Sequence, residues 1–241
     1  LPIVWCVSSS GKLLGLTYIP EESVGAWHQH TTPDGEFESV ASVPEGDEDA
    51  VYVVVKRGNK RYVERFADQY RGDTSTLSDA YLVDFGVSYS GASTTTVTNL
   101  DHLEGKAVSY LADGVAGTGT VTSGTLTLTK AASTVQVGLA YTSQIQTLPM
   151  TMMNVDAFGT GRTKNVNKVW VRTFESGAFK TGPSASNLRS SLSPSSGAIA
   201  TGLVQVTLPA SWDDDGQIVI QQEDPLPLTV VGLTIEVASG G

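Results

Sequence analysis

The sequence predicts an all-β protein, and three observations support this prediction. Apolar residues alternate with polar ones or form short continuous runs along nearly the whole chain, and both patterns are typical of strands. Gly, Pro, Asn and Asp interrupt these runs about every 8–12 residues, which is the spacing found in all-β domains. Almost no segment shows the apolar period of an amphipathic helix. We expect partial β-propeller blades, then a small β-barrel or sandwich, then a C-terminal β-domain.

The first section, residues 1–75, is predicted to resemble propeller blades. Its strands are expected at Ile3–Ser8, Lys12–Ile19, Val24–His30, Glu36–Val43, Ala50–Arg57 and Arg61–Phe66. Ser10-Gly11 and Gly58-Asn59 mark two hairpin turns, and Val51–Val55 is apolar on both faces, as in a central strand. Six strands make about one and a half four-stranded blades. Because open blade edges are costly, we expect the missing blades upstream in a longer protein.

The second section, residues 81–148, follows a polar connector at residues 67–80 and is predicted to be a small Thr-rich barrel or sandwich. Asp101-His102 lies in a short connector, and the strand Val108–Ala112 is expected to end in an Asp113-Gly114 turn. Thr125–Thr129 alternates between Thr and Leu, which predicts one apolar and one hydroxyl-bearing strand face. A short turn is expected before the next strand, Val135–Leu139.

The third section, residues 149–241, is predicted to be a C-terminal β-domain. Its expected strands are Lys168–Phe174, Leu203–Leu208, Gln217–Gln222 and Leu228–Val237. Residues 183–197 contain seven serines and are predicted to form a loop. Pro225-Leu226-Pro227 is expected to introduce the last strand at a sheet edge, because proline cannot donate a ladder hydrogen bond.

The composition is that of a folded protein with an acidic surface. The chain has 241 residues, of which 40% are hydrophobic and 17% charged, enough apolar material for a core and too little charge for disorder. A formal net charge of −10 disfavours sequence-specific DNA binding, since the DNA backbone is also negative. The charge serves solubility or, alternatively, forms an acidic channel wall along which DNA passes without sticking.

Cysteine content and hydropathy argue against a disulfide-bonded fold and against a membrane-spanning helix. The single cysteine, Cys6, allows no intrachain disulfide, and its apolar surroundings predict a buried, unreactive thiol. No apolar run approaches the roughly 20 residues of a membrane helix, so we expect no membrane span, and no signal peptide is recognisable. The chain opens at Leu1 without an initiator Met, which favours a fragment or a processed piece.

Histidines and acidic residues offer weak metal-binding patterns. His28 and His30 are expected to share a strand face, but the third histidine, His102, is far along the chain and no thiolate is near, so we expect no metal site. Asp213-Asp214-Asp215-Gly216 resembles part of a calcium loop. With Gly216 in the sixth position, however, Ser211 and Gln222 occupy the first and twelfth positions, where carboxylates are needed. We predict an acidic turn between two strands.

Catalytic and cofactor patterns are also weak. Gly86-Val87-Ser88-Tyr89-Ser90 lacks the second glycine of a nucleophile elbow, and no helix is expected after it. No Gly-rich phosphate loop with its lysine is found. Trp5, Trp27, Trp170 and Trp212 could form a sugar-binding platform, although packing in cores and interfaces is the more common role of tryptophan. We therefore predict no catalytic, cofactor-binding or metal-binding residue and no cofactor.

Four ordered stretches resemble one protein family. They are Trp5–Tyr18 with Ala26-Trp27-His28 and Glu38-Ser39-Val40; Arg61–Phe66; Leu100–Gly114 with Val137–Tyr141; and Trp212, Gly216 and Pro225–Thr229. The set resembles the tail nozzle proteins (tail tubular B or stabilisation proteins) of short-tailed bacteriophages, in their C-terminal portion. The resemblance spans nearly the whole chain in the family's order.

The resemblance implies a structural protein and not an enzyme. It implies a virion subunit that forms a homo-oligomeric ring, a hexamer, at the phage tail tip. The implied partners are a tail adaptor protein and tail fibre or needle proteins, with transient passage of double-stranded DNA during genome ejection. Two alternatives stay open: a carbohydrate-binding β-module of a tail or receptor-recognition protein, and a hydrolytic tail enzyme, which would need two carboxylates facing each other across a cleft.

Overall fold

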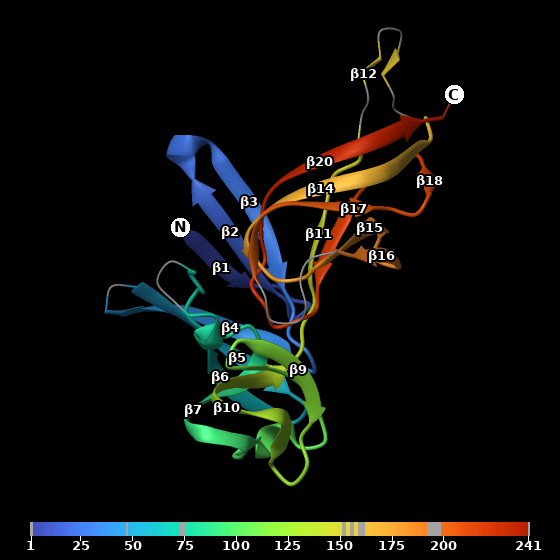
Figure 1. The fold of residues 1–241 in the computed structure, drawn as a ribbon. Coiled ribbons are helices and arrows are strands. Elements are labelled where there is room, and N and C mark those ends of the chain that lie inside the picture. The colour runs from blue at the N-terminus through green and yellow to red at the C-terminus, as the bar shows by residue number, and fades with distance from the viewer. Residues whose placement is uncertain are drawn as a thin grey trace. The chain divides into compact units, whose positions relative to one another are not determined.

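The computed structural model describes residues 2–46, 48–72, 76–150, 153–154, 157–158, 162–191 and 199–240, and these residues form an all-β protein (Figure 1). All strand pairing in them is antiparallel, and they contain no α-helix, only short 3₁₀ turns. The all-β prediction is confirmed. None of the helices in these residues has the length and apolar character needed to cross a bilayer.

The chain divides into two compact units, residues 1–69 and 70–241. The division into sections 1–75, 81–148 and 149–241 stays a prediction. Each unit is described separately.

The first unit contains two three-stranded sheets, ordered β1-β2-β3 and β4-β5-β6. The elements are β1 (Ile3–Val7), β2 (Leu13–Ile19), the 3₁₀ turn η1 (Pro20–Glu22), β3 (Val24–His30), β4 (Glu36–Glu45), β5 (Glu48–Arg57) and β6 (Lys60–Arg65). The six predicted strands are confirmed to within two residues at their ends. A propeller blade has four strands, so the propeller remains a proposal.

The core of the first unit lies between its two sheets. Leu13 comes from the first sheet and Phe37, Val53 and Val55 from the second, and all four are buried. Strand β5 is central, as predicted, and its alternate residues Val53 and Val55 point into this core. The glycine turn at Gly11 has a φ of +73°, and its carbonyl accepts a hydrogen bond from the amide of Phe37 at 2.9 Å. This turn links the two sheets.

The N-terminal part of the second unit is one four-stranded sheet, ordered β7-β10-β8-β9. Its elements are the 3₁₀ turns η2 (Leu77–Asp79) and η3 (Asp101–Leu103) and the strands β7 (Asp84–Val97), β8 (Ala107–Ala112), β9 (Val115–Thr120) and β10 (Leu126–Leu139). The Asp113-Gly114 turn after β8 is confirmed, with φ values of 45° and 81°. β7 and β9 end the sheet without pairing to each other, so the described residues contain no closed barrel.

Strand β10 corrects one prediction and confirms another. No turn separates residues 125–129 from residues 135–139, because β10 runs without a break through both. Register shifts against β7 between Thr127 and Thr134 absorb the intervening residues as bulges, so the strand bends without reversing. The alternation is confirmed, since Leu126 and Leu128 are buried while Thr127 and Thr129 are exposed.

The C-terminal part of the second unit packs two sheets against each other. Its strands are β11 (Ser143–Gln146), β12 (Met153–Asn154), β13 (Ala157–Phe158), β14 (Lys164–Ser176), β15 (Lys180–Ser184), β16 (Asn187–Ser190), β17 (Ala200–Thr207), β18 (Trp212–Asp213), β19 (Val219–Gln222) and β20 (Thr229–Ser239). One sheet is ordered β17-β14-β18 with β20 also paired to β14, the other β11-β19-β15-β16, and β12 pairs with β13. Val169, Val171, Ile218 and Ile220 lie in the core between the two larger sheets.

The four predicted strands of this part are confirmed as β14, β17, β19 and β20, with β14 longer than expected. Within the described residues, β20 pairs with β14 alone and therefore lies at a sheet edge, as the preceding prolines predicted. The prediction of a Ser-rich loop at residues 183–197 is wrong for the first part of that range, because β15 and β16 form a hairpin there. β15 also pairs with β19, and this pairing holds the hairpin in the sheet. The serine content of the segment does not reveal that pairing. Residues 192–198 lie outside the described residues.

Candidate functional site

His28 and His30 lie together on β3, as their spacing predicted, but they are packed between rings. Nδ1 of His28 is 2.8 Å from Nε2 of His30, so one neutral ring donates to the other. Trp5 meets the ring of His28 edge-on at 5.5 Å between centroids, and Phe66 lies 6.0 Å from His30. A Cβ at Gly15, the register partner of His28, would lie 2.2 Å from Cε1 of that imidazole. The pair belongs to the packing of the first unit.

The third histidine belongs to the other unit. His102 lies in η3 of the second unit, where its Nε2 is 3.1 Å from the carbonyl oxygen of Phe85. Within the described ranges, no three His, Cys, Asp or Glu side chains are grouped to hold a metal ion. The absence of a metal site stays a prediction.

We expect acid to destabilise the first unit, because the histidine pair is packed inside it. Burial lowers the pKa of His30, and the neighbouring His28 lowers this pKa further. A depressed pKa means that the folded state favours the neutral imidazole. The resulting stability is present above the unfolded pKa of about 6.5 and is lost as pH falls from there through the lower folded pKa. Hydrogen exchange of β1–β3, measured from about pH 8 downward and corrected for intrinsic rates, is expected to show this loss.

His30→Gln is the matched variant for this measurement, because glutamine keeps a hydrogen-bonding side chain but does not titrate in that range. The loss of protection below about pH 6.5 is expected to shrink in the variant. An identical pH profile in both proteins would contradict the assignment to His30.

The acidic sequence at Asp213 forms a turn between β18 and β19, as predicted. Oδ1 of Asp213 accepts hydrogen bonds from the backbone amides of Asp215, at 2.9 Å, and Gly216. Lys164 is only 1% exposed, and its ammonium donates to the carbonyl oxygens of Asp214 at 2.6 Å and Arg162 at 3.1 Å. The ammonium group of Lys164 therefore binds a backbone carbonyl oxygen of this turn, that of Asp214.

The segment Leu100–Gly114, which carries much of the family resemblance, supports the fold. Leu100 and Leu103 are buried in the core of the four-stranded sheet. The carboxylate of Glu104 accepts hydrogen bonds from the amides of Ser123 and Gly124 at 2.9 and 2.7 Å, which lower the pKa of Glu104. Asp113 accepts from the amide of Thr134 at 2.8 Å. These carboxylates therefore hold backbone turns of this part of the fold in place.

Residues 86–90 lie inside β7, whose register continues to Val97, so no strand-to-helix elbow forms at Ser88. Tertiary contacts explain the glycine that begins this stretch. A Cβ at Gly86 would lie 2.2 Å from the carbonyl oxygen of Val137 on the neighbouring strand. The glycine allows the two strands to approach closely, and this packing explains its presence at position 86.

The four tryptophans divide between packing and exposure. Trp5 packs against the core of the first unit, as the packing interpretation predicts. Trp27 is 64% and Trp212 54% exposed, while Trp170 is half-buried on β14. Trp212 and Trp170 lie in the same unit, so they are the two tryptophans that remain candidates for a sugar-binding platform.

The clearest unpartnered surface of the first unit is the outer side of the sheet β1-β2-β3, here called the apolar outer face. Strand alternation and register place the following apolar side chains on it: Val4, Cys6, Leu14, Leu16, Tyr18 and Trp27. Val4 is 58% and Tyr18 52% exposed. Cys6 is only half-buried, contrary to the prediction of a buried thiol, because its neighbour Trp5 takes the inward position on β1.

This face carries little charge. Gln29 pairs with Leu14 and accepts a hydrogen bond from Lys12, at the end of the sheet, at 3.2 Å. Isolated exposed apolar residues are common on soluble proteins, whereas a contiguous apolar patch marks an interaction site. The apolar outer face is therefore the candidate functional surface of this unit.

Comparison with known proteins assigns no family: no protein-family pattern matches the chain, and no curated protein matches it.

Proposed function

We propose that the protein is a structural subunit of a bacteriophage tail ring, resembling the nozzle through which the genome is ejected. The observation that carries this proposal is the apolar outer face of β1-β2-β3, which includes the exposed side chains of Val4, Tyr18 and Trp27. Burying such a surface against a neighbouring subunit is favourable by about 25 cal/mol per Å². The resemblance of four ordered sequence stretches to tail nozzle proteins is the reason for proposing a tail ring as the assembly.

Assembly also accounts for the open sheet edges. β1 and β3 are the two edges of their sheet, and each offers backbone groups for pairing with another chain. In the proposed ring, the strands of the first unit belong to propeller blades. The four-stranded sheet of the second unit is the small barrel-like domain. Head-to-tail contacts of this kind close into a ring when the rotation between subunits allows it.

The charge of the chain fits a conduit for DNA in the virion. A net charge of −10 lowers affinity for the phosphate backbone, so DNA in transit is not held by the ring wall. The tail adaptor and the fibre or needle proteins are the proposed neighbours. No bond-making or bond-breaking step is assigned to any residue.

Sedimentation velocity of the 241-residue chain, together with electron microscopy, tests the proposal. We expect concentration-dependent assembly into closed rings, because the apolar outer face is buried between subunits. Trp27→Glu places a charge on that face and is expected to leave the chain monomeric.

Val63→Glu is the control, since Val63 is 74% exposed on β6, away from the apolar outer face. It is expected to assemble as the unmodified chain does. A chain that stays monomeric at all concentrations, or a Trp27→Glu variant that still forms rings, would refute the proposed role of this face.

A further inference from the structure

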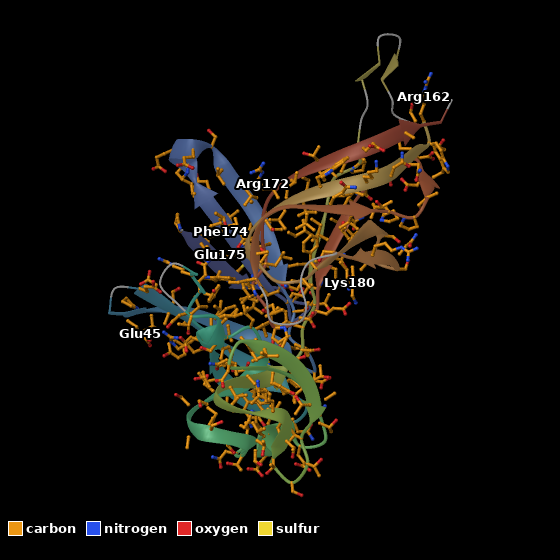
Figure 2. The ribbon with its side chains drawn as sticks, in the orientation of Figure 1. Glu45, Arg162, Arg172, Phe174, Glu175 and Lys180 are labelled. Atoms are coloured by element: carbon orange, nitrogen blue, oxygen red, sulfur yellow. The ribbon has the colours of Figure 1, made fainter. Side chains whose placement is uncertain are left out.

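We propose that the outer face of the β17-β14-β20 sheet binds an extended acidic polysaccharide. This surface, the β14 platform, consists of Trp170, Arg172 and Phe174 on β14 and Trp212 on β18, with polar residues of β17 and β20 beside them. It lies in the second unit and is a binding function beyond the proposed ring. Figure 2 labels Arg172 and Phe174 on the same end of β14.

The alternation of β14 produces this face. Val169 and Val171 are 0% exposed in the core between the two sheets. The residues between and after them therefore point to the opposite side. Among these, Arg172 is exposed, Phe174 is 49% exposed and Trp170 is half-buried. Aromatic and basic side chains thus alternate along one exposed row.

Strand pairing adds a second tryptophan to the same face. Trp212 pairs with Asn165, which is itself only 6% exposed. A register shift between Val166 and Lys168 brings Asn165 to the same side of the sheet as Trp170, since their partners Ala238 and Thr234 alternate regularly along β20. The side chain of Asn165 fixes this position, because its Oδ1 accepts a hydrogen bond from the amide of Ser211 at 2.8 Å. From Asn165 to Phe174 the strand extends roughly 30 Å at its ordinary rise per residue. The row is long enough for several sugar rings.

Polar groups flank the aromatic rings. Trp170 lies between Gln205 on β17 and Thr234 on β20, and both of these side chains are exposed. Arg172 lies between the exposed Leu203 on β17 and Gly232 on β20, where an added Cβ would meet no atom within 4 Å. Apolar C–H faces of sugars pack on aromatic rings, while amide and hydroxyl groups bond to sugar hydroxyls.

The charge of the platform favours an acidic ligand. Lys168 pairs with Glu236 at 3.5 Å, whereas the described residues provide no ion pair for Arg172. Arg172 is therefore the cation of this row without an ion pair in the described part of the chain, although Glu175 follows Phe174 and the net charge of the chain is −10. Arg172 can bind a sugar carboxylate with two parallel hydrogen bonds.

Two other polymers fit less well. A nucleic acid strand presents a phosphate at every nucleotide, and its affinity rises with the number of phosphates neutralised, but this face offers one unpaired cation. A peptide strand joins a sheet through a free backbone edge, whereas the row of aromatic and basic side chains lies on the face of the central strand β14, which is paired with β17 and β20. An extended polysaccharide needs neither feature.

Isothermal titration calorimetry of the full chain with hexagalacturonate tests the proposal. We expect a dissociation constant in the micromolar-to-millimolar range, and at least about tenfold weaker binding of neutral cellohexaose. Phe174→Ala and Arg172→Gln alter exposed side chains and are expected to fold normally. Each is expected to weaken hexagalacturonate binding about tenfold, with Arg172→Gln removing the preference for the acidic sugar.

Val63→Ala is the control, because it shortens an exposed apolar side chain of β6 that belongs neither to the β14 platform nor to the apolar outer face. Its binding is expected to equal that of the unmodified chain. The proposal is overturned by absence of hexagalacturonate binding, by equal binding of cellohexaose, by unchanged binding in both platform variants, or by preferential binding of oligothymidylate. None of these outcomes bears on ring formation, which the sedimentation experiment tests separately.

Discussion

Arg57→Met is expected to destabilise the first unit by about 3–5 kcal/mol, because it leaves the carboxylate of Glu64 without its partner in a largely buried site. The Arg57 guanidinium binds both oxygens of Glu64, at 2.8 and 2.9 Å. The side chains are only 7% and 19% exposed. Hydrogen-exchange protection of β5 and β6, followed through urea titration, measures the effect on this unit alone.

The same guanidinium also bonds the connection between β3 and β4. It donates to the hydroxyl of Thr32 at 2.7 Å and to the carbonyl oxygen of Pro33 at 2.5 Å. Arg57→Lys keeps the charge but cannot reproduce this fork of donors, and we expect an intermediate loss of stability.

The double variant Arg57→Met with Glu64→Met is the control for an unpaired charge. Replacing both partners by apolar side chains is expected to recover a large part of the stability lost in Arg57→Met. If Arg57→Met alone cost less than about 1 kcal/mol, the pair would be no more than a surface ion pair.

Leu126→Ala is expected to destabilise the second unit by about 2–5 kcal/mol, because it leaves a cavity in a close-packed core. Leu126 is 1% exposed among the core residues of the sheet β7-β10-β8-β9. The Leu126 side chain fills the space over Gly119, because a Cβ added to Gly119 would lie 2.6 Å from Cδ1 of Leu126. Urea unfolding monitored by hydrogen exchange of β8 and β10 measures the loss.

Thr127→Ala is the matched control one residue along the same strand. Thr127 lies on the exposed face, and its replacement is expected to change stability by less than about 0.5 kcal/mol. A similar cost at both positions would mean that β10 does not have one buried and one exposed face.

Strand positions were predictable because they depend on neighbouring residues. The alternation around Leu126 and the turns at Gly11 and Gly58 are local patterns, and the structure places strands and turns where these patterns predicted them. The failures occurred where local chemistry was ambiguous. The small residues near Ala132 fit a bulge as well as a turn, and the serines near Ser184 fit an edge hairpin as well as a loop.

The functional surfaces were only partly visible in the sequence. The tryptophans were recognised as candidates, but the sequence does not reveal that Trp212 and Trp170 share a sheet face. That relation requires the pairing of Trp212 with Asn165, 47 positions earlier in the chain. Arg57 gave no signal at all, because an arginine in a strand is usually exposed.

By itself, the sequence determined that this chain is all-β and where most of its strands lie, since side-chain alternation and turn residues act over a few positions. Only the tertiary structure decided which strand faces are covered. It placed the Arg57–Glu64 pair in a largely buried site and half-buried His30, and it left Trp27, Trp212 and Phe174 exposed. Sheet pairing and packing join residues that are distant in the chain, and no local pattern records those contacts.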